Sequence, residues 1–285
     1  MIYSRIYGGL GNQLFQYAAS RAVSLRTGTD LLLDTRLAPE GSHWAFALDH
    51  FNINARIAEP SDLPPNKYKL IRYALWRTFG RHPKFMRENG LGYQEAIAKA
   101  PDDTYLHGYF QSERYFADVL DLLEDELRIV TPPDKQNAEY AKRIANAGHT
   151  VSLHMRRGDY LGTPKSSATY ATCDEAYYLR ALQQLSQGGH DLKVFVFSDD
   201  PDWVRANLRL PYDMTAVGHN GPDKHYEDLR LMSYCNDHII ANSTFSWWGG
   251  WLDRRPEARV VGPAKWFNDP KLANPDILPD RWITV

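Results

Sequence analysis

Two arginines, a glycine and an aspartate follow an apolar stretch near the middle of the chain, in VSLHMRRGDY at 151–160. The apolar residues predict a buried strand, and open α/β sheets bind ligands at the carboxyl ends of such strands. Arg156 shares a strand face with His154, since side chains two positions apart point the same way. A planar guanidinium can grip a diphosphate through two parallel hydrogen bonds. We therefore predict an anion site at Arg156, although a structural ion pair with Asp159 would explain the same charges.

Three glycines near the N-terminus, in YGGLGNQLFQYA at 7–18, lie between an expected strand and an expected helix. Glycine lets backbone N–H groups approach an oxyanion, and a helix N-terminus adds a partial positive charge. Gly8, Gly9 and Gly11 therefore form a second candidate anion site. The GKS ending of a P-loop and the GxGxxG spacing of a dinucleotide fold are both missing. A tight turn without a ligand explains these glycines equally well.

The stretch SDDPDW at 198–203 has three acidic residues, of which Asp200 and Asp202 match the DxD pattern of metal-dependent sugar-nucleotide enzymes. Helix capping explains two of them without a cation, because Asp200 fits the N-cap and Asp202 the first turn. Pro201 fits the first helical position. We therefore expect no metal ion at this motif. Asp199, at the expected strand end, has no capping role and stays a candidate ligand-binding residue.

The segment HYEDLRLMSYCNDHIIANSTFSWWGGWL at 225–252 joins an expected helix to a strand and then to a turn rich in hydroxyl and aromatic residues. On the helix, Asp228 can accept hydrogen bonds from N1–H and N2–H of guanine, a pair of donors that adenine does not offer. Ser243 and Thr244 can cap the next helix or donate to a phosphate at its N-terminus. The simpler interpretation takes Phe245 and the tryptophans after it as core.

The order of the expected elements favours two Rossmann-like halves. A strand, a helix closed by Gly28 and a second strand form one βαβ unit, and a strand and a helix capped by Ser112 follow an irregular region at 36–101. The pair Pro132–Pro133 marks the expected linker, so we expect domains at 1–131 and 132–285. The second half has a helix at 135–147 and strands at 150–156, 192–198, 213–217 and 237–242.

Composition excludes several classes of protein. The 285 residues carry a formal net charge of −2, so no overall field favours nucleic acid or an anionic membrane. Cys173 and Cys235 lie far apart, which argues against a zinc site and a disulfide framework and favours a reducing compartment. There is no run of about 18 apolar residues, so we expect neither a membrane span nor a signal peptide.

Six blocks spread along the chain resemble those of bacterial α1,2-fucosyltransferases, the family 11 glycosyltransferases. They are GGLGNQLFQYA, LDHFNI, GYFQSERYF, HMRRGDY, SDD and NSTFSWWGGWL. The resemblance implies an α/β, GT-B-like fold of two Rossmann-like domains facing across a cleft, with the acceptor on the N-terminal domain and GDP-fucose on the C-terminal one. It also implies inverting transfer of L-fucose to the 2-hydroxyl of a terminal β-galactoside, with no metal ion and no other cofactor.

The same resemblance implies roles for single residues. Arg156 is similar to the arginine that grips the β-phosphate, and His154 to its neighbour over the nucleoside. The family shares no obvious general base, so Asp159 is our candidate for its place beside Arg156, with a role as partner of that arginine left open. The catalytic residues are thus expected to be Arg156, Asp159 and Asn12, and the GDP-fucose site to contain Gly9, Gly11, His154, Asp199, Asp228, Ser243, Thr244 and Phe245.

Two other functions stay open at this point. One is a GDP-fucose-dependent transferase of another linkage, such as α1,6. The other is a non-catalytic carbohydrate-binding protein, since 13% of the residues are aromatic. The expected partners are GDP-fucose and a galactoside acceptor, without nucleic acid. The expected place is the bacterial cytoplasm, in O-antigen or capsule biosynthesis, where a lipid-linked acceptor would give peripheral membrane association.

Overall fold

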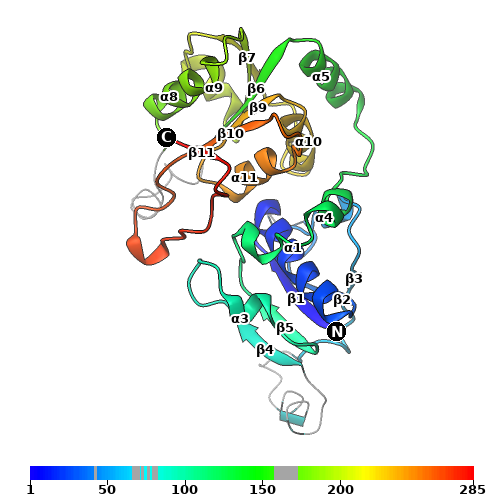
Figure 1. Cartoon of the computed structure of the whole chain (residues 1–285). Coiled ribbons are helices and arrows are strands. Elements are labelled where there is room, and N and C mark those ends of the chain that lie inside the picture. The colour runs from blue at the N-terminus through cyan, green and yellow to red at the C-terminus, as the bar shows by residue number, and fades with distance from the viewer. Residues whose placement is uncertain (42–43, 66–70, 72–73, 76–77, 79–82, 157–172) are drawn as a thin grey trace. The chain divides into compact units, whose positions relative to one another are not determined.

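The computed structural model describes residues 1–41, 44–65, 71, 74–75, 78, 83–156 and 173–285 (Figure 1). The chain divides into two compact units, Met1–Glu126 and Leu127–Val285, which we call the N-terminal unit and the C-terminal unit. Each unit has its own sheet, and all the strand pairings are parallel. The α/β class expected from the sequence is confirmed.

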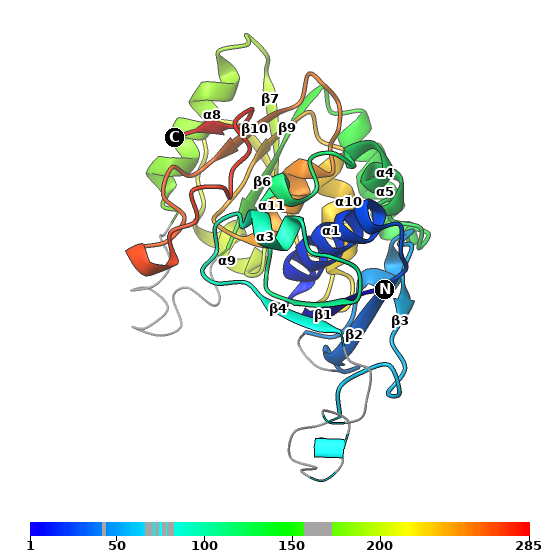
Figure 2. The same cartoon turned by 60° about the horizontal axis from the view of Figure 1, so that its bottom comes forward.

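The N-terminal unit contains a five-stranded sheet in the order β3-β2-β1-β5-β4. Helix α1 runs along one face of this sheet (Figure 2). The elements are β1 (Ile2–Tyr7), α1 (Leu10–Thr27), β2 (Leu31–Leu37), η1 (Leu48–His50), β3 (Arg56–Ile57), β4 (Lys84–Arg87), α3 (Glu95–Ala98), β5 (Thr104–His107), η2 (Glu113–Tyr115) and α4 (Leu120–Glu126).

Helix α1 is positioned by its apolar side and by its two terminal glycines. Phe15 and Ala18 are fully buried beside Ile2 and Ile6 of β1, and burying one large apolar side chain is worth roughly 1.5–3 kcal/mol. Gly28 ends the helix in the left-handed conformation at φ 64°, as expected. The start differs from the expectation, because the helix already begins at Leu10. Gly11 therefore lies inside the first helical turn and only Gly8 and Gly9 form the turn before it.

Two expectations for this unit were wrong. The region expected to be irregular contributes the short strands β3 and β4, which have too few residues to show a period of two. The helix expected after Ser112 breaks into η2 and α4, although Ser112 does accept from the backbone N–H of Arg114. Tyr115 and Phe116, at the end of η2, are both buried, and residues 116–119 between η2 and α4 are not helical. Within the region at 36–101, the stretch KYKLIRYALWRTFGR at 67–81, which reads as irregular helix, lies mostly outside the described residues.

The C-terminal unit contains a six-stranded sheet in the order β11-β10-β9-β6-β7-β8. The four expected strands are present, and two short strands near the C-terminus were missed. The elements are α5 (Lys135–Ala145), β6 (His149–Met155), α8 (Glu175–Ser186), β7 (Leu192–Ser198), α9 (Pro201–Asn207), β8 (Asp213–Val217), α10 (His225–Ser233), β9 (Asp237–Ile239), α11 (Thr244–Trp251), β10 (Arg259–Gly262), η3 (Pro270–Leu272) and β11 (Ile283–Thr284).

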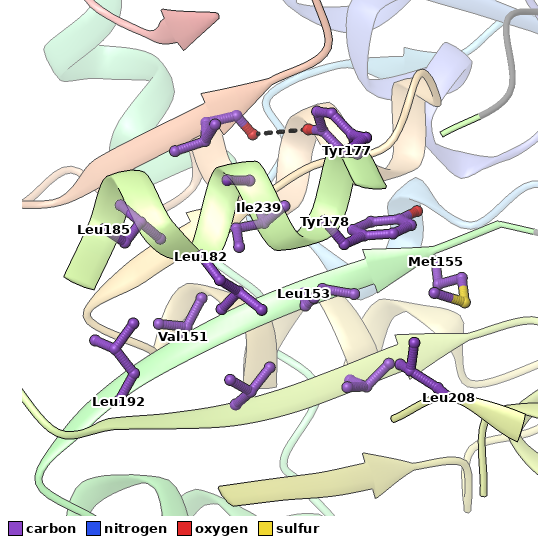
Figure 3. Close-up of a cluster of buried hydrophobic side chains, with 14 of the residues drawn as sticks. Val151, Leu153, Met155, Tyr177, Tyr178, Leu182, Leu185, Leu192, Leu208 and Ile239 are labelled. Carbon is purple, nitrogen blue, oxygen red and sulfur yellow. Dashed lines mark hydrogen bonds between the residues drawn. The ribbon is translucent and has the colours of Figure 1, made fainter. Parts of the chain in front are cut away.

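A buried cluster holds β6 and β7 against helix α8 (Figure 3). Val151 and Leu153 of β6 are completely buried, and Leu182 of α8 packs in the same cluster. The hydroxyl of Tyr177 donates to the carbonyl of Ile240, which directly follows β9. The cluster therefore fixes the carboxyl ends of β6 and β9, from which the candidate site residues follow.

The two cysteines, Cys173 and Cys235, are free thiols. Among the residues that the structure describes, no helix combines the length and the apolar character needed to cross a membrane.

Candidate active site

The C-terminal sheet changes direction at β6. The chain passes outward from β6 through β7 to β8, and then returns to pair β9 on the other side of β6. At such a switch point the connections leave neighbouring strands in opposite directions, and ligands of open α/β sheets bind in the resulting crevice. Arg156 directly follows β6, and Ser243 lies in the turn after β9. Asp199 directly follows β7 on the adjacent strand.

His154 lies near the end of β6 with only 5% of its surface exposed. Burial lowers the pKa of His154 to about 4, the charge of Arg156 lowers it further, and the charge of Asp199 opposes the change. The ring is therefore neutral at pH 7. It lies 5.4 Å from the ring of Phe245, between centroids, and its Nδ1 has no hydrogen-bond partner among the described residues. A neutral ring with an available nitrogen suits contact with a nucleoside.

Arg156 is half-buried at the end of β6, and its charge reaches His154. The topology thus brings Arg156, His154, Asp199 and Phe245 to one edge of the sheet. Asp159 lies outside the described residues, so its role as base or as arginine partner stays a prediction.

The hydroxyls after β9 lie at the N-terminus of α11. Ser243 occupies the N-cap position, yet its side chain makes no capping hydrogen bond, and Thr244 is the first helical residue. The hydroxyl of Ser246 accepts from the backbone N–H of Ala241. Capping therefore does not use the Ser243 hydroxyl, and it can donate to an anion at the helix N-terminus. The core role expected for the tryptophans of this segment is confirmed, because Trp247 and Trp248 are fully buried.

Asp228 lies on α10, one turn after His225, whose ring is 6.2 Å from that of Phe245. Burial raises the pKa of Asp228 to about 7, while a hydrogen bond from Asn220 lowers it and the charge of Glu227 raises it. In this hydrogen bond, Asn220 Nδ2 donates to Asp228 Oδ1 at 2.7 Å. A carboxyl with this pKa changes its charge near neutral pH, which is typical of functional sites.

The acidic motif after β7 behaves as the capping interpretation predicts. Asp200 is the N-cap of α9 and accepts from the backbone N–H of Trp203 at 3.1 Å, with Pro201 in the first turn. Asp202 accepts from Arg205 Nη1 at 2.6 Å. Among the described residues there is no group of three or more His, Cys, Asp or Glu side chains placed to hold a metal ion.

The N-terminal sheet has its own switch point, between β1 and β5. Gly8 has φ 78°, and a Cβ there would lie 2.9 Å from Asn12 Nδ2, so this turn requires glycine. Gly9 is the N-cap of α1, and a Cβ there would meet nothing within 4 Å. Asn12 Oδ1 accepts from Nε2 of Gln111, which follows β5, at 3.0 Å. Gly9 and Asn12 therefore lie together at the carboxyl edge of this sheet.

Aromatic residues at this edge were missed by sequence reasoning. The ring of Tyr7 lies 4.8 Å from that of Tyr109 and 5.6 Å from that of His107, between centroids. Glu88 accepts from the backbone N–H groups of Tyr109 at 2.6 Å and Phe110 at 3.0 Å, and burial raises the pKa of Glu88 to about 7. The sequence signal was HGYF at the end of an expected strand at 103–110, but only the pairing of β1 with β5 shows that Tyr7 joins it.

Each of the two parallel α/β units has candidate ligand-binding side chains at its switch point. This combination is typical of GT-B-like glycosyltransferases, which use sugar nucleotides as donors. The profile described as "Glycosyl transferase family 11" matches residues 92–285, and the chain belongs to this family of glycosyltransferases. The resemblance seen in the sequence motifs is confirmed.

Relatives match the chain along its whole length. It is 30% identical to an α-1,2-colitosyltransferase of Escherichia coli over 100% of this chain and 99% of the relative. It is 29% identical to the O-antigen biosynthesis glycosyltransferase WbnK of Escherichia coli, over 100% of both chains. The chain is therefore similar to complete glycosyltransferases and not only to one domain of them.

A solved structure of the NodZ α-1,6-fucosyltransferase, soaked with GDP-fucose, has a similar fold. The TM-score is 0.51 at 15% sequence identity, and the match covers 88% of this chain and 91% of that chain. At this identity the likeness shows the fold alone. It confirms the GT-B-like fold, whereas the arrangement of the two domains across a cleft stays a prediction.

Proposed function

We propose that this glycosyltransferase is an inverting, metal-independent fucosyltransferase, which transfers L-fucose from GDP-fucose to the 2-hydroxyl of a terminal β-galactoside. The observation that carries the proposal is the gathering of Arg156, His154 and the Ser243 turn at the switch point between β6 and β9. The C-terminal unit would bind the donor, and the N-terminal unit would bind the acceptor.

In this proposal the donor is held at both ends of its nucleotide. Asp228 accepts from N1–H and N2–H of guanine, and the neutral ring of His154 contacts the nucleoside. Arg156 and the Ser243 hydroxyl bind the diphosphate, together with Thr244 at the N-terminus of α11. The ring of Phe245 lies near the rings of both His154, at the end of β6, and His225, on α10.

Charge flow explains why these groups would accelerate the reaction. As the bond between fucose C1 and the β-phosphate oxygen stretches, negative charge grows on the phosphate and positive charge on the sugar ring. Groups that bind the phosphate more strongly at that moment lower the barrier, and Arg156 with the Ser243 turn would do so. The acceptor 2-hydroxyl attacks C1 from the face opposite the departing GDP, and this direction of attack inverts the anomeric centre. The hydroxyl loses its proton to a carboxylate. Asp159 is our candidate for this carboxylate.

The aromatic edge of the N-terminal unit supports acceptor binding there. Sugar-binding sites combine flat apolar surfaces with a few polar groups. Tyr7, His107 and Tyr109 supply such surfaces, and each of them is partly exposed. Gly9 and Asn12 lie at the same edge and would face the reacting end of the donor.

A second candidate donor follows from one of the relatives. The Escherichia coli α-1,2-colitosyltransferase, 30% identical to this chain, is named for colitose, which is L-fucose without its 3-hydroxyl. The name supports an α1,2 linkage and leaves GDP-colitose as the competing donor. A site that hydrogen-bonds the 3-hydroxyl would reject colitose strongly, because its polar groups would stay unpaired.

Product analysis tests the proposal directly. The protein is incubated with GDP-fucose or GDP-colitose and a panel of β-galactosides, and the linkage of the product is read by NMR. An α1,2-fucosyl product with GDP-fucose supports the proposal, and preferred use of GDP-colitose or an α1,6 product contradicts it. Calorimetry with GDP, ADP and free oligosaccharide identifies the carbohydrate-binding alternative, in which sugar binds without any selectivity for GDP.

A further inference from the structure

Two asparagines face each other beside Asp228. Asn137 Nδ2 donates to Asn220 Oδ1 at 2.9 Å, and Asn220 Nδ2 donates back to Asn137 Oδ1 at 3.0 Å. The second hydrogen of Asn220 Nδ2 is donated to Asp228 Oδ1 at 2.7 Å. Asn220 therefore presents an N–H group to Asp228, and the reciprocal pairing with Asn137 holds the amide in place.

Asn137 is itself held by the segment around it. It is completely buried at the start of α5, and Asp134 Oδ1 accepts both its backbone N–H at 2.9 Å and its Nδ2 at 3.1 Å. Nε2 of His219 lies 2.9 Å from Asn137 Oδ1 and must carry the hydrogen, since that oxygen can only accept. All the hydrogen-bonding positions of the Asn137 amide are used. Asn220 therefore cannot turn without breaking several bonds.

Most charged groups around Asp228 are already paired with each other. Arg230 Nε contacts Glu227 Oε2 at 2.7 Å, and Lys224 Nζ contacts Asp134 Oδ2 at 2.9 Å. Among the described residues, Asn220 is the one hydrogen-bond donor to the Asp228 carboxyl. The titratable and charged groups that face this region are Asp134, His219, Lys224, His225, Glu227 and Arg230.

We propose that Asn220 is a positioning residue for the nucleobase, which holds Asp228 as a carboxylate able to accept two adjacent N–H donors of a guanine edge. The proposal rests on the proposed function, in which Asp228 reads guanine. An N–H group facing Oδ1 excludes a proton on that oxygen, and so Asn220 favours the ionised form that burial disfavours. Without this bond the carboxyl would be protonated over a wider pH range and would lose one acceptor.

The test is the pH dependence of nucleotide binding. Calorimetry gives the ratio of GDP to ADP affinity between pH 5.5 and 9, and the ratio removes the ionisation of the phosphates. For the parent, the ratio should rise with pH through a midpoint near 7, where half of the Asp228 carboxyls are ionised, and then level off. For Asn220→Ala the midpoint should lie at higher pH, with a loss of about fivefold at pH 7 for an increase of one pKa unit, since half of the parent carboxyls are already protonated there, and with recovery as the pH rises above the new midpoint.

A merely structural role gives a different result. In that case Asn220→Ala lowers GDP affinity equally at every pH and leaves the midpoint of the rise unchanged, which overturns the proposal. Asn220→Ser also withdraws the amide from Asp228 and serves if the alanine variant does not fold. Asn207→Ala is the matched control, since Asn207 is an exposed asparagine of α9 that bonds the carbonyl of Trp203. It should leave the profile of the parent.

Asp228→Asn separates failure of this inference from failure of the proposed function. If this variant binds GDP as tightly as the parent, Asp228 does not read guanine and the role of Asn220 falls with it, while the proposed transfer of fucose is judged by the product linkage. If it loses GDP selectivity and the pH dependence while Asn220→Ala retains both, only the role of Asn220 is contradicted. Loss of the pH dependence in Asp228→Asn together with the upward shift in Asn220→Ala supports both.

Discussion

At the carboxyl edge of the N-terminal sheet, aromatic rings meet at the switch point between β1 and β5, whereas charged and hydrogen-bonding groups gather at the switch point between β6 and β9. The topology is alike, since in both sheets the first strand of the unit lies between the strand that directly follows it and a strand that comes later in the chain. The chemistry differs because the proposed tasks differ. An acceptor sugar needs surface and orientation, while a departing diphosphate needs donors and positive charge.

A second contrast lies in two half-buried carboxyls. Burial raises the pKa of both Glu88 and Asp228 to about 7. Glu88 uses both oxygens on the backbone N–H groups of Tyr109 and Phe110, so it fixes the shape of the loop after β5. Asp228 Oδ1 accepts from one side chain, and Oδ2 has no hydrogen-bond partner among the described residues. A similar pKa thus accompanies an anchor in one unit and a candidate ligand-binding group in the other.

The strongest test of the comparison is Arg156→Lys. If the edge of the C-terminal sheet stabilises the leaving group, kcat should fall roughly 100-fold or more, because a point charge cannot reproduce bidentate phosphate contacts. The thermal midpoint Tm should change little. Arg205→Lys, at an exposed arginine of α9, is the control and should keep the parent kcat. Parent-like turnover in folded Arg156→Lys would remove Arg156 from the mechanism.

Tyr7→Ala tests the other edge. We expect KM for the galactoside to rise about tenfold, which is the usual effect of losing a ring at the centre of a binding surface. GDP affinity should not change. Tyr7→Phe keeps the ring and should retain most of the acceptor affinity, and Tyr234→Ala, at a tyrosine with 47% exposure, is the control. A loss of GDP affinity with unchanged acceptor KM would reverse the roles assigned to the two edges.

The partly buried position of Glu88 predicts a pH effect on stability, because burial raises its pKa although the two backbone N–H groups act in the opposite direction. Its pKa is higher in the folded protein, about 7, than its ordinary value, so its stabilising contribution is complete below about pH 4.5 and is lost as the pH rises through 7. Tm of the parent should therefore fall between pH 5 and pH 8, and Glu88→Gln should show a smaller fall, by a few degrees. Glu124→Gln, at an exposed position, should behave as the parent. An equal fall in all three proteins would contradict the assignment.

The smallest expected effect is that of removing metal ions. Because the leaving group is assigned to Arg156 and the turn at Ser243, activity after exhaustive EDTA treatment should stay within about twofold of the untreated value. Asp200 and Asp202 are occupied as helix-capping and ion-pairing residues. If EDTA abolished turnover and Mn²⁺ or Mg²⁺ restored it, leaving-group stabilisation at the C-terminal sheet would need a cation. The assignment of that role to Arg156 and the Ser243 turn alone would then be wrong.

Sequence reasoning succeeded where the signal was local. The long apolar strands β6 and β7 were predictable, and so was the capping of α9 by Asp200, because each depends on neighbouring residues. The strands β3, β4, β10 and β11 have two to four residues each and carry no usable period. Their place in the sheets is set by their neighbours.

The candidate site was predictable only in part for the same reason. His154 lies near the end of a strand that could be recognised, and Arg156 and Ser243 follow such strands, so their common edge follows from a parallel sheet. The pairing of Tyr7 with His107 depends on β5 lying beside β1, and the bond from Asn220 to Asp228 depends on how a loop meets a helix. Neither contact has a signature in the spacing of residues.

The strand order of the N-terminal sheet has a consequence for folding on the ribosome. Strand β4 pairs with β5 and with no other strand of the described sheet, and β5 lies between β4 and β1. A nascent chain that ends before Thr104 therefore leaves the edge of β1 and the whole of β4 without partners. Closing the sheet joins Tyr3 to Tyr105, a contact of long range that slows folding and exposes unpaired strand edges to aggregation. Chaperone dependence should accordingly be greatest while this first half emerges.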